Sequence, residues 1–226
     1  MTRCSICGGT EFTSRKVLWP ELVAAWGLSP DETAYVDDQQ GRCCTGCGAS
    51  LRVVALGRAI QDACHTTSVI RSCADDPRLA TLRILDLNGA DVLSPALAGL
   101  PGYVRADFPQ VDMEALSYPD GMFDLVIHSD TLEHVPNPLQ ALMECRRVLA
   151  DQGHLCFTIP VIVGRMTRSR EGIPKSWHGN PALTADDYLV RTEFGADAWT
   201  YLMRAGFSRL SIHQVEYPAA TAFTAW

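Results

Sequence analysis

The stretch from Phe123 to Pro160 constrains the fold of this chain most, because it reads as one uninterrupted strand, helix and strand. Residues 123–127 form a short apolar run after a turn at Asp120–Gly121, as expected for a strand buried on both faces. Asn137 is a favourable N-cap, and Pro138 suits the first position of a helix. Two strands joined by such a helix lie parallel, with a right-handed crossover. The sequence therefore predicts half of a doubly wound α/β sheet.

Further strands and helices are expected on both sides of this unit. Its own helix begins at Pro138 and is stopped by Asp151–Gly153, and its second strand covers 154–160. The other expected strands are 81–87, 103–107, a brief one within 111–116, and 209–215. Helices are expected at 92–99 and 197–205, the latter closed by Gly206. Together these elements give an α/β fold with one central sheet.

Nine cysteines suggest a set of disulfides, but their number is odd and the expected compartment is reducing. Cys4 and Cys7 form one CxxCG turn, and Cys44 and Cys47 form a second. Two such turns supply the four soft ligands that tetrahedral zinc requires, so we predict a structural zinc site. Four free thiols are the alternative, and Cys43 is a rival ligand that would break the matched spacing. The remaining cysteines, Cys64, Cys73, Cys145 and Cys156, lie in apolar surroundings and are expected in the core.

We expect three parts along the chain: a zinc-binding module at 1–50, a helical linker covering the cleft at 51–78, and the sheet domain at 79–226. A short helix is predicted within 19–28, and two more at 51–64 and 68–74. Trp19 and Trp26 are expected to pack in the interior rather than to form a substrate-facing wall, because large aromatic side chains mostly serve cores.

Composition and charge restrict the partners. No apolar run approaches the roughly 20 residues that span a bilayer, and the chain start lacks the apolar core of a secretory signal. We therefore expect a cytoplasmic protein with no membrane contact. A formal charge of −7 argues against a nucleic-acid partner. One basic cluster is present, interpreted as a solvated loop or, alternatively, a contact to an acidic substrate: Arg165, Arg168, Arg170 and Lys175. The sequence does not indicate an oligomeric state.

Two segments inside the central unit carry a family resemblance. FDLVIHSDTLEHVPNP, followed by a helix and RRVLADQGHLCFTIP, resembles the class I S-adenosylmethionine-dependent methyltransferases, and within them the methyltransferase type 11 group. The resemblance extends over roughly residues 81–213. It implies a Rossmann-like class I methyltransferase sheet, here with a small N-terminal zinc-binding module, and S-adenosylmethionine as the cofactor.

The resemblance also implies where the cofactor lies. Family members have an acidic residue and a GxGxG loop after the first strand; here Asp86, Asn88 and Gly89 stand there, and Gly89 is the only glycine of that loop. Asp107 corresponds to the acid that binds the ribose hydroxyls. Asp112 and Met113 correspond to the adenine contacts, although Asp112 could instead cap a turn. His128 and Ser129 end the fourth strand, beside the site of methyl transfer.

A general base could come from two histidines. His134 belongs to the LEHV segment of the family, where a helix- and loop-ordering role is the alternative. His178 lies in the loop from Arg165 to Phe194, which also holds Trp177 and Tyr188. A loop this long with such residues is usually functional, so we interpret it as an acceptor lid, with a purely structural loop as the alternative. Histidine suits proton transfer because its pKa lies near neutrality.

The predicted function is methyl transfer from S-adenosylmethionine to a small molecule that is hydroxylated, sugar-like or aromatic. Two alternatives stay open. The eroded glycine loop could mark a degenerate member that has lost cofactor binding and serves as a binding or structural module. An RNA methyltransferase is the other, because some of these enzymes carry an N-terminal zinc ribbon.

Overall fold

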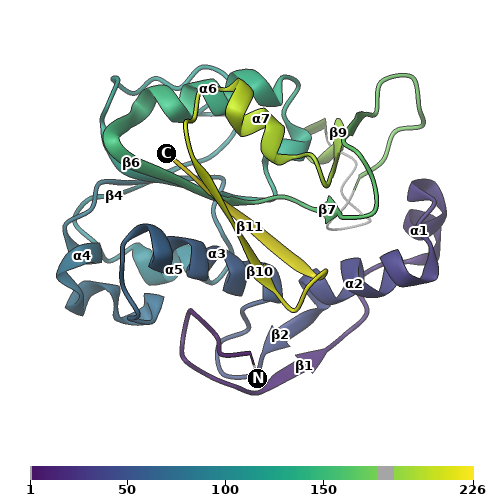
Figure 1. Cartoon of the computed structure of the whole chain (residues 1–226), viewed down its shortest axis with the longest axis horizontal. Coiled ribbons are helices and arrows are strands. Elements are labelled where there is room, and N and C mark those ends of the chain that lie inside the picture. Colours follow the sequence, from purple (N-terminus) through teal and green to yellow (C-terminus); the bar gives the residue numbers. More distant parts are fainter. Residues whose placement is uncertain (1, 178–185) are drawn as a thin grey trace.

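A computed structural model describes residues 2–177 and 186–226, and its centre is a mixed sheet of six strands in the order β10-β11-β6-β5-β3-β4 (Figure 1). β4, β3, β5 and β6 run parallel, whereas β11 is antiparallel to β6 and β10 is antiparallel to β11. The strands are β3 (Ile84–Leu87), β4 (Tyr103–Ala106), β5 (Phe123–Ser129), β6 (Leu149–Thr158), β10 (Leu210–Val215) and β11 (Ala220–Ala225). This arrangement confirms the predicted Rossmann-like sheet.

Helices cover both faces of the sheet. In Figure 1, α6 (Pro138–Val148) and α7 (Trp199–Arg204) lie above it, and α3 (Leu51–Ala63), α4 (Pro77–Ala80) and α5 (Leu93–Leu97) lie below it. Strand residues alternate between the two layers. Leu85 and Leu87 pack toward α6, whereas Ile84 packs toward α3 and α5. The parallel strands are therefore apolar on both sides, as the sequence predicted.

The N-terminal part joins the same core as the sheet. The strands β1 (Phe12–Ser14) and β2 (Arg42–Cys44) pair antiparallel, and α1 (Pro20–Trp26) and α2 (Pro30–Gly41) lie between them in the chain. Cys4 and Ile6 are fully buried in one cluster with Leu51 and Ile84. α3 lies against β6, β10 and β11, so it covers the sheet face. The predicted division of the chain at residues 50 and 78 stays a prediction.

A second, three-stranded sheet follows β6 and was missed by the sequence analysis. It has the order β7-β9-β8, with β7 (Val161–Ile162), β8 (Arg168–Ser169) and β9 (Thr192–Gly195). Short 3₁₀ turns complete the described elements, at Ile70–Asp75, Leu132–His134 and Asp186–Tyr188. In the part of the chain described, no helix combines the length and the apolar character needed to cross a membrane.

Two local predictions were wrong. Residues 111–116 do not form a strand: the amide of Val111 bonds the carbonyl of Asp107, and that of Leu116 bonds the carboxylate of Glu144 on α6. A parallel neighbour needs a crossover of about a dozen residues, and the five-residue step from Asp107 to Asp112 leaves no room for one. The predicted stop at Asp151–Gly153 lies inside β6, because the helix ends at Val148 and the strand begins at the next residue.

Candidate active site

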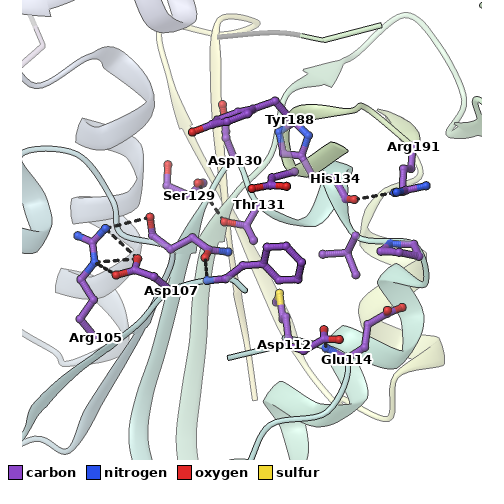
Figure 2. A pocket seen from close by; sticks show the side chains of 16 residues that line it. Arg105, Asp107, Asp112, Glu114, Ser129, Asp130, Thr131, His134, Tyr188 and Arg191 are labelled. Carbon is purple, nitrogen blue, oxygen red and sulfur yellow. Dashed lines mark hydrogen bonds and ion pairs between the residues drawn. The ribbon is translucent and has the colours of Figure 1, made fainter. Parts of the chain in front are cut away.

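A cavity of about 570 Å³ opens at the carboxyl ends of β3, β4 and β5 (Figure 2). This is where ligands bind in open α/β sheets. Six of the residues singled out from the sequence line it: Asn88, Asp107, Asp112, Met113, Ser129 and His134. The fold thus brings together side chains from the ends of three strands, the 107–116 segment and the turn after β5.

The loop after β3 has left-handed backbone angles at two successive residues, although only one of them is a glycine. Asn88 has φ +60° and Gly89 has φ +76°. Asparagine tolerates this left-handed region better than most residues, and its Oδ1 accepts a hydrogen bond from the amide of Phe108 at 2.8 Å. At Gly89, a Cβ atom would collide with the guanidinium of Arg105. Gly89 therefore suits its left-handed backbone angle, and a side chain there would also have to displace the flexible end of Arg105.

The carboxylate of Asp107, predicted to bind ribose, is paired with Arg105. Arg105 Nε lies 3.0 Å from each carboxylate oxygen, and its Nη2 lies 2.9 Å from Oδ1. The two side chains are 45% and 49% exposed. Exposed ion pairs contribute only about 0–1 kcal/mol, so a ligand that bonds to Asp107 can replace this pair at small cost.

Residues 107–114, which follow β4, contribute several side chains to the cavity lining. Met113 is buried there, whereas Phe108 is 49% exposed and was not identified from the sequence, although it directly follows Asp107. The Oδ1 atom of Asp112 accepts the amide of Glu114 at 2.8 Å. Asp112 therefore caps a turn, as the alternative interpretation proposed, while it also lines the cavity.

Asp86 and His128 are fully buried and do not line the cavity, which is a correction to the predicted cofactor contacts. Asp86 accepts hydrogen bonds from Ser94 Oγ at 2.5 Å and Tyr103 Oη at 2.6 Å, and burial raises its pKa. His128 stacks on Phe157 with the ring centres 4.6 Å apart. Burial lowers the pKa of His128 to about 3, so the ring is neutral at physiological pH. Alternation along the strands explains both, because each side chain points into a packed layer rather than beyond the strand end.

His134 anchors the lid segment to the turn after β5. Its Nδ1 lies 3.2 Å from the carbonyl oxygen of Leu189, which can only accept, so Nδ1 carries the proton. The Nε2 atom lies 3.6 Å from the carboxylate of Glu133. Arg191 adds two bonds, from its amide to the carbonyl of Glu133 at 2.8 Å and from its Nε to that of His134 at 3.1 Å.

Three residues of the predicted lid line the cavity, namely Asp187, Tyr188 and Arg191, while the role of the loop as an acceptor lid stays a prediction. Trp177 does not line it and instead forms a β-bridge with Leu189. The other predicted base, His178, which the sequence favours over His134, lies outside the described residues, so its role stays a prediction.

A buried ion pair at the cavity was not foreseen. Arg52 on α3 pairs with Asp130, which lines the cavity directly after β5 and has a left-handed φ of +46°. Gln40 Nε2 on α2 donates to the same carboxylate at 3.3 Å. Burial lowers the pKa of Arg52 to about 10, which leaves it charged at neutral pH. In the sequence, this pair is indicated only by Arg52, which is the one charged residue in the apolar run LRVVAL.

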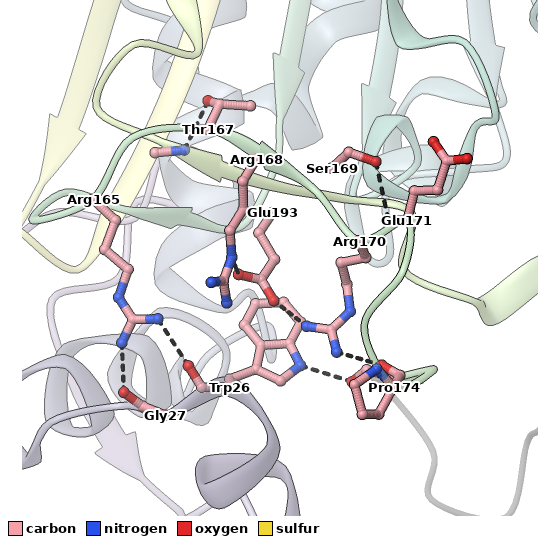
Figure 3. A network of polar contacts seen from close by, with 12 residues as sticks. Trp26, Gly27, Arg165, Thr167, Arg168, Ser169, Arg170, Glu171, Pro174 and Glu193 are labelled. Carbon is pink, nitrogen blue, oxygen red and sulfur yellow. Dashed lines mark hydrogen bonds and ion pairs between the residues drawn. The ribbon is translucent and has the colours of Figure 1, made fainter.

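The three arginines of the basic cluster in the lid are bound to partners within the protein and do not form a free anion site (Figure 3). Arg165 forms an ion pair with Glu32 at 2.6 Å, and it donates to the carbonyl oxygens of Trp26 and Gly27 at 2.8 and 2.7 Å. Arg168 and Arg170 both pair with the buried Glu193. The contacts of Arg165 attach α1 and α2 to the segment after β6. Lys175 is exposed and takes no part in the ion pairs.

The four predicted zinc ligands converge. The sulfur atoms of Cys4, Cys7, Cys44 and Cys47 all lie within 4.8 Å of one another, and the pairs Cys4–Cys47 and Cys7–Cys44 are 3.6 Å apart. A tetrahedral zinc with bonds of about 2.3 Å places its sulfurs about 3.8 Å apart. A Cβ at Gly9 would lie 3.1 Å from the sulfur of Cys44, so this glycine leaves room for the cluster. The donor set therefore fits zinc.

Parts of this chain are similar to known proteins. Residues 63–157 match the family model described as "Methyltransferase domain". The ubiquinone biosynthesis O-methyltransferase of Marinobacter nauticus is 26% identical over 136 residues, which is 57% of this chain and 49% of that protein. A highly reducing polyketide synthase of Aspergillus sclerotiorum is 27% identical over 179 residues, 75% of this chain and 7% of the synthase. The chain thus spans about half the length, or less, of the curated relatives it matches.

Among solved structures, an S-adenosylmethionine-dependent methyltransferase of Thermotoga maritima, a possible histamine N-methyltransferase, is 14% identical with a TM-score of 0.42. That match covers 69% of this chain and 86% of the other, and no argument about function rests on it. Residues 63–157 are thus similar to a methyltransferase domain, and part of the chain is similar to about half of a curated O-methyltransferase.

Proposed function

We propose that this chain transfers the methyl group of S-adenosylmethionine to a small-molecule acceptor that is hydroxylated, sugar-like or aromatic. The observation that carries the proposal is the cavity at the strand ends, where Asn88, Asp107, Met113 and Ser129 meet within a region that matches a methyltransferase domain over residues 63–157. The bound cofactor supplies an electrophilic methyl group on a sulfonium. The protein has to hold the acceptor against it and exclude water.

Residues at the ends of β3 and β4 have the chemistry to hold the cofactor. The carboxylate of Asp107 can accept hydrogen bonds from both ribose hydroxyls in exchange for its exposed bond to Arg105. Phe108 and Met113 offer apolar surfaces to the adenine ring, and the second oxygen of Asp112 can accept a bond from its amino group. Asn88 and Gly89 let the backbone approach closely.

His134 is the candidate base among the described residues. Because Nδ1 donates to the carbonyl of Leu189, Nε2 is the basic nitrogen. A proton taken up at Nε2 is stabilised by the carboxylate of Glu133, 3.6 Å away. The base is needed only if the acceptor loses a proton during transfer. His178, the base that the sequence favours, stays a candidate.

We also propose that zinc, held by Cys4, Cys7, Cys44 and Cys47, serves structure alone. All four donors are thiolates from the protein, which is the closed ligand set of structural sites. The cluster is built from β1–β2 and their flanks, at a distance in the chain from every residue that lines the cavity.

One observation favours the degenerate alternative. Arg105 lies over Gly89 and on Asp107, where a cofactor would have to bind. The pair between Arg105 and Asp107 is exposed and therefore weak, so Arg105 can move aside when a ligand binds. The methyltransferase proposal and the degenerate alternative thus predict different affinities for the cofactor. No comparable observation favours RNA methylation, since the basic cluster Arg165, Arg168 and Arg170 is paired with Glu32 and Glu193.

Calorimetric titration with S-adenosylhomocysteine, the product form of the cofactor, tests the proposal. Asp107→Ala should weaken binding by about 1.5–3 kcal/mol, typical for lost hydrogen bonds to a charged group. Asp124→Ala is the matched control, because Asp124 forms a similar exposed pair with Arg83 but does not line the cavity. Absence of binding by the wild type supports the degenerate alternative. Tight binding unchanged by Asp107→Ala would place the ribose contact elsewhere.

A further inference from the structure

Arg191 is a cation in the cavity wall that no acid of the described residues neutralises. Its Nε donates to the carbonyl of His134 at 3.1 Å, and its amide donates to that of Glu133 at 2.8 Å. Within residues 2–177 and 186–226, its terminal nitrogens Nη1 and Nη2 have neither a hydrogen bond nor an ion pair. Figure 2 shows the side chain beside His134 at one end of the cavity.

The acidic residues that line the cavity either have another partner or form no ion pair with Arg191 in the described structure. Asp107 pairs with Arg105, and Asp130 pairs with Arg52. Glu114 accepts the amide of Asn137 at 2.5 Å. Asp187 also lines the cavity, yet it forms no ion pair with Arg191 in the described structure.

The other arginines of the same lid have partners within the protein and can be compared with Arg191. Arg165, Arg168 and Arg170 each form an ion pair with a glutamate. Arg191 instead uses only its Nε edge, on a backbone carbonyl. That leaves the edge formed by Nη1 and Nη2, which matches the two oxygens of a carboxylate or phosphate.

The surroundings of Arg191 suit an apolar or aromatic body. Val135 and Pro136 line the cavity next to His134, and Tyr188 is 41% exposed there. The positive sulfonium of the proposed cofactor adds to the attraction for an anion. We propose that the acceptor is an aromatic or apolar small molecule carrying a carboxylate or phosphate, and that Arg191 binds this anionic group. The inference rests on the proposed function of the cavity.

Three small probes test the anion site without knowledge of the true acceptor. Benzoate, phenyl phosphate and the neutral isostere benzamide are titrated by NMR, with and without S-adenosylhomocysteine. At least one anion should bind about 10- to 100-fold more tightly than benzamide, the range for a hydrogen-bonded charge. Arg191→Gln should remove that preference, and Arg191→Lys, which keeps the charge but not the paired donors, should retain part of it. Whether benzoate or phenyl phosphate binds better identifies the anion.

Arg168→Gln is the matched control, because Arg168 belongs to the same segment but pairs with Glu193 outside the cavity lining. It should leave the preference unchanged, and melting temperatures show whether each variant folds. Equal binding of anions and benzamide, no anion binding, or a preference that survives Arg191→Gln overturns the inference. Failure to bind S-adenosylhomocysteine, with anion binding intact, contradicts the proposed function instead.

Discussion

The indole Nε1 of Trp26 donates a hydrogen bond of 2.7 Å to the hydroxyl of Ser176, although the two residues are 150 positions apart in the chain. The guanidinium of Arg170 lies 5.7 Å from the centre of the same indole. Trp26 is buried in a small cluster with Leu22, Ile162 and Val190. The tip of α1 is thereby attached to the segment that overhangs the cavity. Interior packing of Trp26, expected from the sequence, is confirmed.

A double-mutant cycle on this bond should show coupling. Trp26→Phe and Ser176→Ala each remove one partner, and their free energies of unfolding should be non-additive by about 0.5–1.5 kcal/mol. Urea unfolding of the two single variants and the double variant measures this. Trp19→Phe combined with Ser176→Ala serves as control and should be additive. Additivity of the Trp26 pair would show that the bond contributes nothing.

Acid should weaken the attachment of α2 to the lid. The ion pair with Arg165 lowers the pKa of Glu32 to about 2. The folded state therefore binds fewer protons at this group than the unfolded state, whose carboxyl titrates near its ordinary value of about 4.3. The stabilisation is present above about pH 4.3 and is lost as the pH falls toward 2. Acid titrations of stability should show a shallower decline in this range for Glu32→Gln than for the wild type.

His128 should make the protein sensitive to acid at higher pH. Its folded pKa of about 3 lies below the ordinary value of about 6.5, so protonation favours the unfolded state. Stability should fall as the pH drops from about 6.5 toward 3, by up to about 1.4 kcal/mol per pH unit. His128→Leu should flatten this decline in urea unfolding series, whereas His65→Gln, at an exposed position, should not. An unchanged slope in His128→Leu would assign the acid sensitivity to other groups.

Zinc content should depend on the clustered cysteines alone. Cys44→Ser removes one ligand and should lower zinc below stoichiometry and unfold the N-terminal part first, because metal binding and folding are coupled. Cys43→Ser is the matched control, since this neighbouring thiol lies outside the cluster and contacts the carbonyl of Gln40. Elemental analysis and the thermal transition of each variant give the result. A wild-type protein without stoichiometric zinc would rule out the site.

The sequence by itself determined the elements with strong local signals. β5, α6 and β6 follow from an apolar run, an N-cap at Asn137 and a proline at the first helical turn, all of which act within a few residues. Each CxxC turn is also a local signal, and the structure brings the two predicted turns together into one cluster of four cysteines. α2 was missed because it has no apolar stripe, although Ser29 and Glu32 form a capping box that marks its start.

Only the tertiary structure decided which partners the charged side chains take. Arg165 meets Glu32 across 133 positions, and Arg52 meets Asp130 through the packing of α3 on the sheet. Stacking on Phe157 helps to bury His128, and bonds to the carbonyls of Glu133 and His134 hold Arg191 at the cavity wall. An isolated arginine or histidine has the same local sequence signal in each setting. Its partner, burial and pKa depend on long-range contacts, which form only when the strands and helices assemble.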